Sequence, residues 1–204
     1  MRFAILQRIG IIMAGAVMLL SAPASAQTRS EGYKFLQAVE KRERNEAIDL
    51  ATKPGSTVVN ARDVTNGRTG LHIAVARRDQ AWVDLLMQLK ANPNVADVRG
   101  VTPLMLAVQL GWTEGVQALV RAKARVDDPS GSGETPLITA VLAKNVAMVR
   151  ALMAAGANPD RADNSGRSAR DYAQLAGGSM VDELNRGRAS SGAARKPAQV
   201  YGPQ

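Results

Sequence analysis

Residues 100–107 of the 204-residue chain read Gly-Val-Thr-Pro-Leu-Met-Leu-Ala, and residues 133–140 repeat this as Gly-Glu-Thr-Pro-Leu-Ile-Thr-Ala. Two more segments share the register, Gly67-Arg-Thr-Gly-Leu-His-Ile-Ala74 and Gly166-Arg-Ser-Ala-Arg-Asp-Tyr-Ala173. The leading glycines at 67, 100, 133 and 166 are therefore 33 residues apart each time. Such a fixed period is typical of a protein that stacks one small structural unit several times.

Each repeated segment carries the local signals of a short helix followed by a second helix. Thr102-Pro103 and Thr135-Pro136 stand at the start of the first helix, where a hydroxyl can cap a free amide and proline loses no hydrogen bond. Further along the unit, apolar residues recur at i, i+3 and i+4, as in Val116, Leu119 and Val120. Two short helices cannot bury an apolar face alone, so we expect neighbouring units to stack.

On the segments Thr69-Gly-Leu-His72 and Thr102-Pro-Leu-Met105, the chain resembles the ankyrin-repeat family, whose signature is T-P-L-H-x-A. The resemblance covers roughly residues 33–186. It implies an all-α fold, a solenoid of helix-turn-helix units with β-turn fingers between them. We expect a degenerate N-terminal unit at 33–62, clear units at 63–96, 97–129 and 130–162, and a shortened C-terminal cap at 163–186, whose two helices Gly177-Gly178 divides.

The repeat register assigns framework roles to a set of positions. The matching histidine of the family bridges backbone groups of neighbouring turns, which implies a structural role for His72. Trp82 and Gly115 share one register, and we expect Trp82 to fill the space left by Gly115. Trp112 is either a packing lid or an exposed anchor. The framework positions are Gly67, Thr69, His72, Gly100, Thr102, Pro103, Gly133, Thr135, Pro136 and Gly166.

The two ends of the chain differ from the repeats. Residues 1–26 join a basic start, a short apolar run and Ala24-Ser25-Ala26, which is the pattern of a cleaved secretory signal peptide. We therefore expect a periplasmic bacterial protein, with secretion as the alternative, and a repeat domain within 27–186. Residues 187–204 are basic, polar and rich in small residues, and we expect them to be disordered.

The net charge of +8 raises nucleic acid as a partner only if the charge gathers on one face. Removing the cations of both ends from the 26 Lys and Arg leaves 20 against 18 acids, a surplus of two for the repeat body. We therefore expect no nucleic-acid binding by the body and no membrane span after leader removal. The cations of the two ends are Arg2, Arg8, Arg186, Arg188, Arg195 and Lys196.

The residues that carry chemistry are scarce. The chain has no cysteine and one histidine, which excludes disulfides, thiol nucleophiles and multi-histidine metal sites. Gly131-Ser-Gly133 continues into a repeat turn and not into a phosphate-binding loop. We therefore expect no enzyme activity, no cofactor and no metal.

What remains is a binding surface. In the ankyrin family, partners usually contact the turn tips and the exposed side of the first helix, so the resemblance implies a protein partner, with a monomer as the default state. An alternative is attachment to an anionic polymer, lipid head groups or nucleic acid, through the basic tail. The candidate partner-binding residues are Arg68, Arg77, Val98, Arg99, Val101, Gln109, Leu110, Glu134, Leu142 and Arg167.

Overall fold

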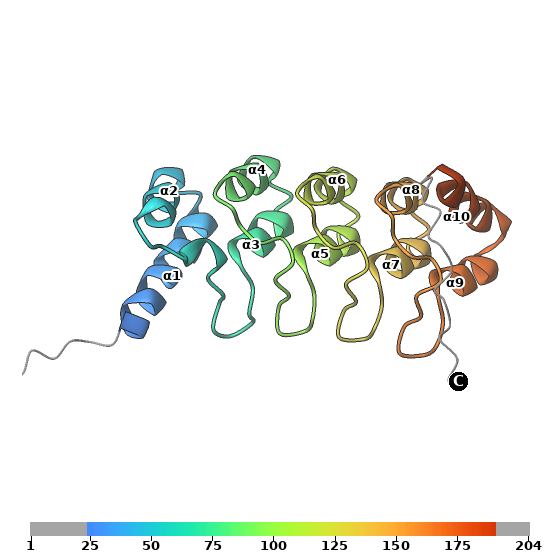
Figure 1. Cartoon of the computed structure of the whole chain (residues 1–204), viewed down its shortest axis with the longest axis horizontal. Coiled ribbons are helices and arrows are strands. Elements are labelled where there is room, and N and C mark those ends of the chain that lie inside the picture. The colour runs from blue at the N-terminus through green and yellow to red at the C-terminus, as the bar shows by residue number, and fades with distance from the viewer. Residues whose placement is uncertain (1–23, 191–204) are drawn as a thin grey trace, which may run out of the picture.

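A computed structural model describes residues 24–190, which form two rows of α-helices and a series of long turns (Figure 1). The first helix of each unit lies in one row: α1 (Ala24–Lys41), α3 (Gly70–Ala76), α5 (Pro103–Gln109), α7 (Pro136–Leu142) and α9 (Ala169–Ala176). The second helices lie in the other: α2 (Arg44–Thr52), α4 (Gln80–Gln88), α6 (Thr113–Arg121), α8 (Val146–Ala154) and α10 (Gly178–Ser190). A short 3-10 helix, η1 (Val58–Asn60), follows α2.

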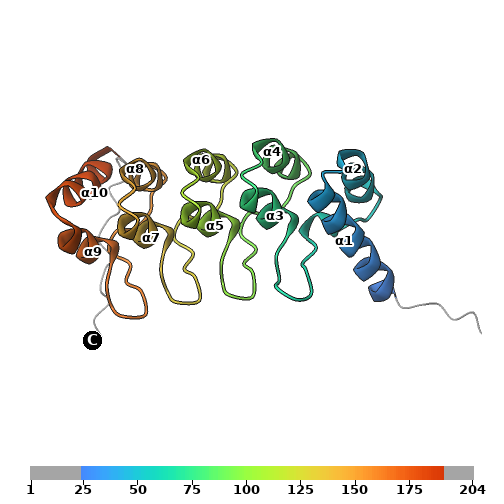
Figure 2. The same cartoon turned by 180° about the vertical axis from the view of Figure 1, so that it is seen from behind.

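Four long turns precede the first helices and project from their row in one direction, as both views show (Figures 1 and 2). We call them fingers 1 to 4, residues 63–68, 97–101, 130–134 and 163–167. The all-α ankyrin-type solenoid that the repeat predicts is confirmed. Within residues 24–190 no helix is long and apolar enough to cross a membrane.

The first helices begin where the sequence predicts. The Met105 amide donates to the Thr102 hydroxyl, and the Ile138 amide donates to that of Thr135, both at 3.2 Å. Pro103 and Pro136 each open the following helix. One unsatisfied amide per helix start is thereby capped, which locally supports helices of only seven residues.

The helices end at residues in the left-handed backbone region, again with the 33-residue period. Lys90, Lys123 and Gly156 follow the second helices with φ of 66°, 64° and 88°. A side chain in this region costs roughly 1 kcal/mol or more relative to glycine. The two lysines therefore weaken helix ends that Gly156 accommodates without strain.

The core runs along the whole stack between the two rows. Leu71, Leu104 and Leu137 of the first helices are at most 1% exposed. Leu86, Leu119 and Leu152 of the second helices are fully buried. Each set repeats every 33 residues, so one apolar position per helix builds a continuous core through successive interfaces.

The expected pairing of Trp82 with Gly115 is wrong. A Cβ atom at Gly115 would collide with the ring of Trp112, which covers that position and is 8% exposed. Trp112 is therefore a packing residue. It stands at the N-cap of α6, where Asp79 of α4 and Asn145 of α8 instead cap amides with their side chains. The ring folds over its own helix start because Gly115 leaves room there.

The first and last helices of the described residues are longer than those of the inner units. Helix α1 begins at Ala24, upstream of residue 33, and α10 runs to Ser190, past residue 186. Phe35 and Val39 anchor α1 in the core, and Met180 and Leu184 anchor α10. Helix propagation from an anchored turn is easier than nucleation, which explains the longer helices. Most of the predicted signal peptide (residues 1–23) and most of the predicted tail (191–204) lie outside the described residues.

Candidate interaction surface

Fingers 1, 2 and 4 are rigidly built, because the carboxylates of Asp63, Asp97 and Asp163 at their bases accept hydrogen bonds from amides of the same finger. Asp97 Oδ1 accepts from the amides of Arg99 at 2.8 Å and Val101 at 2.9 Å. Asp163 accepts from the Ser165 hydroxyl at 2.7 Å and the Tyr172 hydroxyl at 2.8 Å, which lowers its pKa to about 2. The carboxylates therefore stay charged and hold the finger shape at neutral pH.

Neighbouring fingers are joined through their backbones. The Val98 amide donates to the Asn66 carbonyl at 3.0 Å, and the Gly131 amide donates to the Arg99 carbonyl at 2.9 Å. A Cβ at Gly100 would lie 2.8 Å from the Gly131 amide nitrogen, so this approach requires glycine. The repeated glycines at 67, 100, 133 and 166 have φ of 71°, 77°, 81° and 79°.

His72 is completely buried and links two units. Its Nδ1 accepts from the Thr69 amide at 3.1 Å, so its Nε2 carries the proton and donates to the Val101 carbonyl at 2.9 Å. Burial lowers the pKa of His72 from its ordinary value of 6.5. The single histidine of the chain is therefore a neutral framework residue with both ring nitrogens engaged.

Two of the expected partner-binding residues make framework contacts, which leave less of each side chain open to a partner. Val101 is only 5% exposed, because its amide and carbonyl are held by Asp97 and His72. The Arg77 guanidinium reaches the preceding unit, where Nη1 donates to the carbonyls of Val39 and Glu40, both at 2.8 Å. Its side chain is 22% exposed. These acceptors lie at the end of α1 in the preceding unit. Spacing within one unit therefore does not predict the contact.

The other expected residues remain at least partly accessible. Val98 is 66% exposed, Leu142 is 51% exposed, and the side chain of Arg99 is 65% exposed. Gln109 and Arg167 are exposed, whereas Arg68, Leu110 and Glu134 are half-buried. We define the finger–helix surface by these residues together with Leu175.

The sequence reasoning missed Leu175, although its signal was available. Leu175 is 75% exposed and lies 33 residues after Leu142, at the same position of the next first helix. The cap sequence departs from that of the other units, which makes this register less evident. The structure therefore places two exposed leucines at equivalent positions on successive units.

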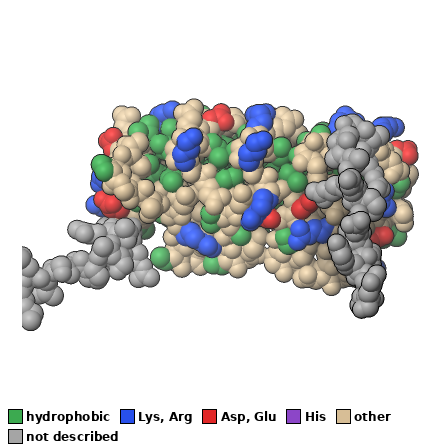
Figure 3. Space-filling model, viewed as in Figure 1, with side chains coloured by type: hydrophobic (Ala, Val, Ile, Leu, Met, Phe, Trp, Pro, Cys, Tyr) green, Lys and Arg blue, Asp and Glu red, His purple; other side chains and the backbone are tan. Residues whose placement is uncertain are grey.

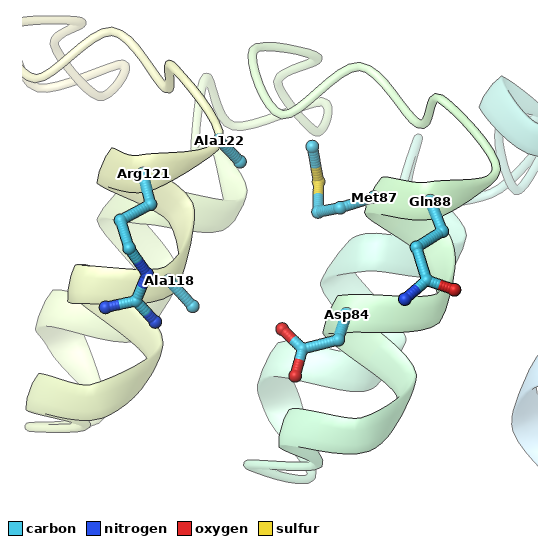
Figure 4. A pocket seen from close by; sticks show the side chains of 6 residues that line it. All are labelled: Asp84, Met87, Gln88, Ala118, Arg121 and Ala122. Atoms are coloured by element: carbon cyan, nitrogen blue, oxygen red, sulfur yellow. The ribbon is translucent and has the colours of Figure 1, made fainter.

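One pocket lies on the second-helix row, away from this surface, and another lies beside finger 1. One, of about 450 Å³, is a crevice between α4 and α6, where Met87 and Asp84 extend toward α6 (Figure 4). It exists because α6 carries Ala118 and Ala122 where α4 carries leucines. The other, of about 380 Å³, lies between α1 and finger 1 and is lined by Gly32, Tyr33, Leu36, Ala61, Arg62, Asp63, Val64 and Thr65.

The basic side chains on the face that Figure 3 shows are dispersed. In the space-filling view, Lys and Arg side chains lie as separate spots with other atoms between them (Figure 3). Among residues 24–190, no cluster of three or more His, Cys, Asp or Glu side chains is placed to hold a metal ion.

Comparisons with known proteins agree with this architecture. A family model described as ankyrin repeats (3 copies) matches residues 35–130, and one described as ankyrin repeats (many copies) matches residues 119–173. The chain belongs to the ankyrin-repeat family. Ankyrin repeats generally mediate protein–protein interaction, and proteins built from them are typically non-catalytic scaffolds.

A protein of fowlpox virus (strain NVSL), whose name describes it as an ankyrin repeat protein, is 36% identical to this chain over 64 residues. The match covers 31% of this chain and only 18% of the relative. The similarity therefore concerns the repeats and not the whole of either protein.

Proposed function

We propose that the protein is a non-catalytic binding module whose protein partner contacts the finger–helix surface. The observation that carries this proposal is the pair Leu142 and Leu175, which expose aliphatic side chains in one register beside exposed fingers. Contiguous apolar patches are rare on the surface of monomeric proteins, and the larger ones mark interaction sites. The fingers and first helices are also rigid enough to present the surface without reorganisation.

The absence of catalysis in this proposal is supported by how the polar groups are used. Both nitrogens of His72 bond to the framework. The carboxylates of Asp97 and Asp163 accept finger amides. These groups are committed to holding the scaffold, which leaves little for acid–base chemistry.

We further propose that the partner is met in the bacterial periplasm. The support is the sequence pattern of residues 1–26, with cleavage after Ala26. Fractionation of the source cells followed by mass spectrometry of the protein's N-terminus tests it. A mature protein starting at Gln27 in the periplasmic fraction is expected, and an intact N-terminus in the cytoplasmic fraction would contradict it.

Affinity capture tests the binding surface. The wild-type chain, a Leu142→Asp/Leu175→Asp variant and a matched Asp84→Lys/Arg121→Glu variant are immobilised and exposed to extract of the source cells. The control preserves net charge and alters the exposed residues on the second-helix row. The partner should be retained by the wild type and the control and lost by the leucine variant. Equal retention by all three would show that the surface lies elsewhere.

A further inference from the structure

The pocket of about 380 Å³ beside finger 1 lies where the row of fingers begins within the described residues. Tyr33 and Leu36 of α1 form one wall, and Val64 and Thr65 of finger 1 form the other. The Tyr33 and Val64 side chains are 61% and 84% exposed, whereas Leu36 is buried. Clefts of this size that are lined by aromatic and aliphatic side chains are typical of ligand sites.

The pocket takes its shape from α1. A Cβ atom at Gly32 would lie only 3.0 Å from the Ala61 Cβ, which marks the point where α1 touches the segment before finger 1. Helix α1 has 18 residues, whereas α3, α5 and α7 have seven each. Its N-terminal part runs beside finger 1 toward the level of the finger tips (Figures 1 and 2). Finger 1 therefore has a helix on the side where fingers 2 and 3 each have another finger.

The backbone of finger 1 is built like that of finger 2. The amides of Asp63 and Asp97 each donate to the carbonyl that closes their finger, both at 2.8 Å, so the next residues, Val64 and Val98, are equivalent. The Val98 amide donates to the Asn66 carbonyl of finger 1 at 3.0 Å, and the same kind of bond joins finger 3 to finger 2. Among the residues whose contacts the structure describes, none accepts a hydrogen bond from the Val64 amide.

The position of this amide indicates what could bind there. In fingers 2 and 3 the equivalent amide is directed toward the preceding finger, so the repeat register directs the Val64 amide toward α1 and the pocket. A backbone N–H requires an acceptor. A donor at the open end of a series of main-chain bonds is where an extended peptide adds through its own carbonyl.

The surroundings favour a single extended segment over a further repeat or a second copy of the chain. The exposed side chains of α1 outside the pocket include the charged Lys34, Glu40 and Lys41, whereas stacking another helix pair requires an apolar face. The pocket itself is lined by one cation, Arg62, and one carboxylate, Asp63. These charges balance, so the lining favours an apolar side chain over a charged one.

We propose that the pocket between α1 and finger 1 binds an extended, uncharged segment of a partner protein. A carbonyl of that segment accepts from the Val64 amide, and a neighbouring aliphatic or aromatic side chain enters the pocket against Tyr33 and Leu36. The pocket shares no residue with the finger–helix surface. This second site therefore goes beyond the proposed function and does not depend on it.

Selection from a displayed library of random peptides of about six residues, a usual strand length, tests this. The full chain is the bait, and the most enriched peptide is synthesised and titrated by fluorescence anisotropy against the wild type, Val64→Asp and Val98→Asp. The second variant is the matched control, because Val98 is also exposed but lies on finger 2, outside the pocket. Circular dichroism checks that both variants are folded.

The enriched peptides should share an aliphatic or aromatic residue and carry no common charge. Their affinity should fall at least about tenfold for Val64→Asp and stay within about threefold for Val98→Asp. Amide hydrogen exchange, followed by NMR, reports on the donor itself. Bound peptide should slow exchange of the Val64 amide at least about tenfold and leave the Val98 amide, which is already bonded to Asn66, unchanged.

No enrichment, equal losses of affinity in the two variants, or an unchanged exchange rate of the Val64 amide would overturn the inference. Binding that is lost only in the Leu142→Asp/Leu175→Asp variant would also overturn it, because the peptide would then lie on the finger–helix surface. A dimer in analytical ultracentrifugation that Val64→Asp dissociates would show that a second copy occupies the pocket instead. The proposed function is tested separately by capture through Leu142 and Leu175.

Discussion

At the scale of single residues, position in the repeat does not by itself fix the role of a side chain. His72 bridges fingers 1 and 2, whereas the equivalent positions hold Met105 and Ile138, which are buried and apolar. Trp112 stands at a capping position and fills space over Gly115 instead. The interfaces between units thus use different chemistry at the same register.

The protonation of His72 predicts a pH dependence of stability. Because burial lowers its pKa below 6.5, the unfolded chain takes up a proton before the folded protein does. The stabilisation by neutral His72 is complete above about pH 6.5 and declines as the pH falls below it, by up to about 1.4 kcal/mol per unit. In urea unfolding, a His72→Gln variant should have a lower free energy of unfolding than the wild type at neutral pH. It should lose less of that free energy when the pH is lowered. Parallel pH curves for the two proteins would contradict this.

Gly115 and Trp112 should show strong energetic coupling. Gly115→Ala places a methyl group against the Trp112 ring and should cost about 1–3 kcal/mol of unfolding free energy. In a Trp112→Ala background the clash is gone, and the better helix propensity of alanine should make the same change stabilising by up to about 1 kcal/mol. The four proteins of this double-mutant cycle are compared by urea unfolding. An equal effect in both backgrounds would refute the contact.

At the scale of elements, helix ends in neighbouring units are tied together by adjacent arginines. Arg77 donates to carbonyls at the end of α1, in the unit before. Arg78 donates to the Leu110 carbonyl at the end of α5, in the unit after. The free carbonyls at a helix C-terminus attract cations, so each bond also complements the helix dipole.

The two arginines should differ in their contribution to stability. Arg77→Met leaves two carbonyls of α1 without their charged donor and should cost about 1.5–3 kcal/mol. Arg78→Met is the matched control, because Arg78 is exposed and water can replace its single bond, and it should cost about 0.5 kcal/mol. Chemical unfolding of both variants and of the wild type measures these two costs. Equal losses of unfolding free energy in the two variants would show that the partial burial of Arg77 does not increase its contribution to stability.

At the scale of the whole molecule, the solenoid is held by contacts between adjacent units. Backbone bonds join fingers 1 to 2 and 2 to 3. The C-terminal cap packs on the preceding unit through both of its helices, and at α10 Arg150 of α8 donates to both carboxylate oxygens of Glu183 at 2.7 and 3.0 Å. Terminal units have one neighbour instead of two, so stability should vary along the chain.

Hydrogen exchange in the native state should reveal this gradient. Amides of α5 and α6 are expected to exchange most slowly, and those of α9 and α10 faster. Arg150→Met removes the donors to Glu183 and should accelerate exchange in α10 while leaving α5 unchanged, whereas Arg121→Met, an exposed arginine of α6, serves as control. A uniform acceleration along the whole chain would mean that the stack unfolds as one unit.

Much of the fold could be predicted because it rests on local signals that repeat. Helix starts at Thr102 and Thr135 and the glycines of the fingers follow from backbone chemistry that each unit carries within itself. The candidate surface was only partly predictable. Leu142 follows from register, whereas the burial of Val101 and the partial burial of Arg77 depend on hydrogen-bond partners in a neighbouring unit.

The amino-acid sequence by itself determined the period, the helix pairs and the line of finger tips, since hydrogen bonds within about four residues decide these features. The tertiary structure alone decided which side chains along that line are free to meet a partner. Stacking brings the His72 ring to the Val101 carbonyl and the Arg77 guanidinium to the end of α1, so these groups are engaged within the stack. The side chains of Leu142 and Leu175 remain exposed. The physical reason is that exposure is a property of the assembled stack, set by groups about one repeat away.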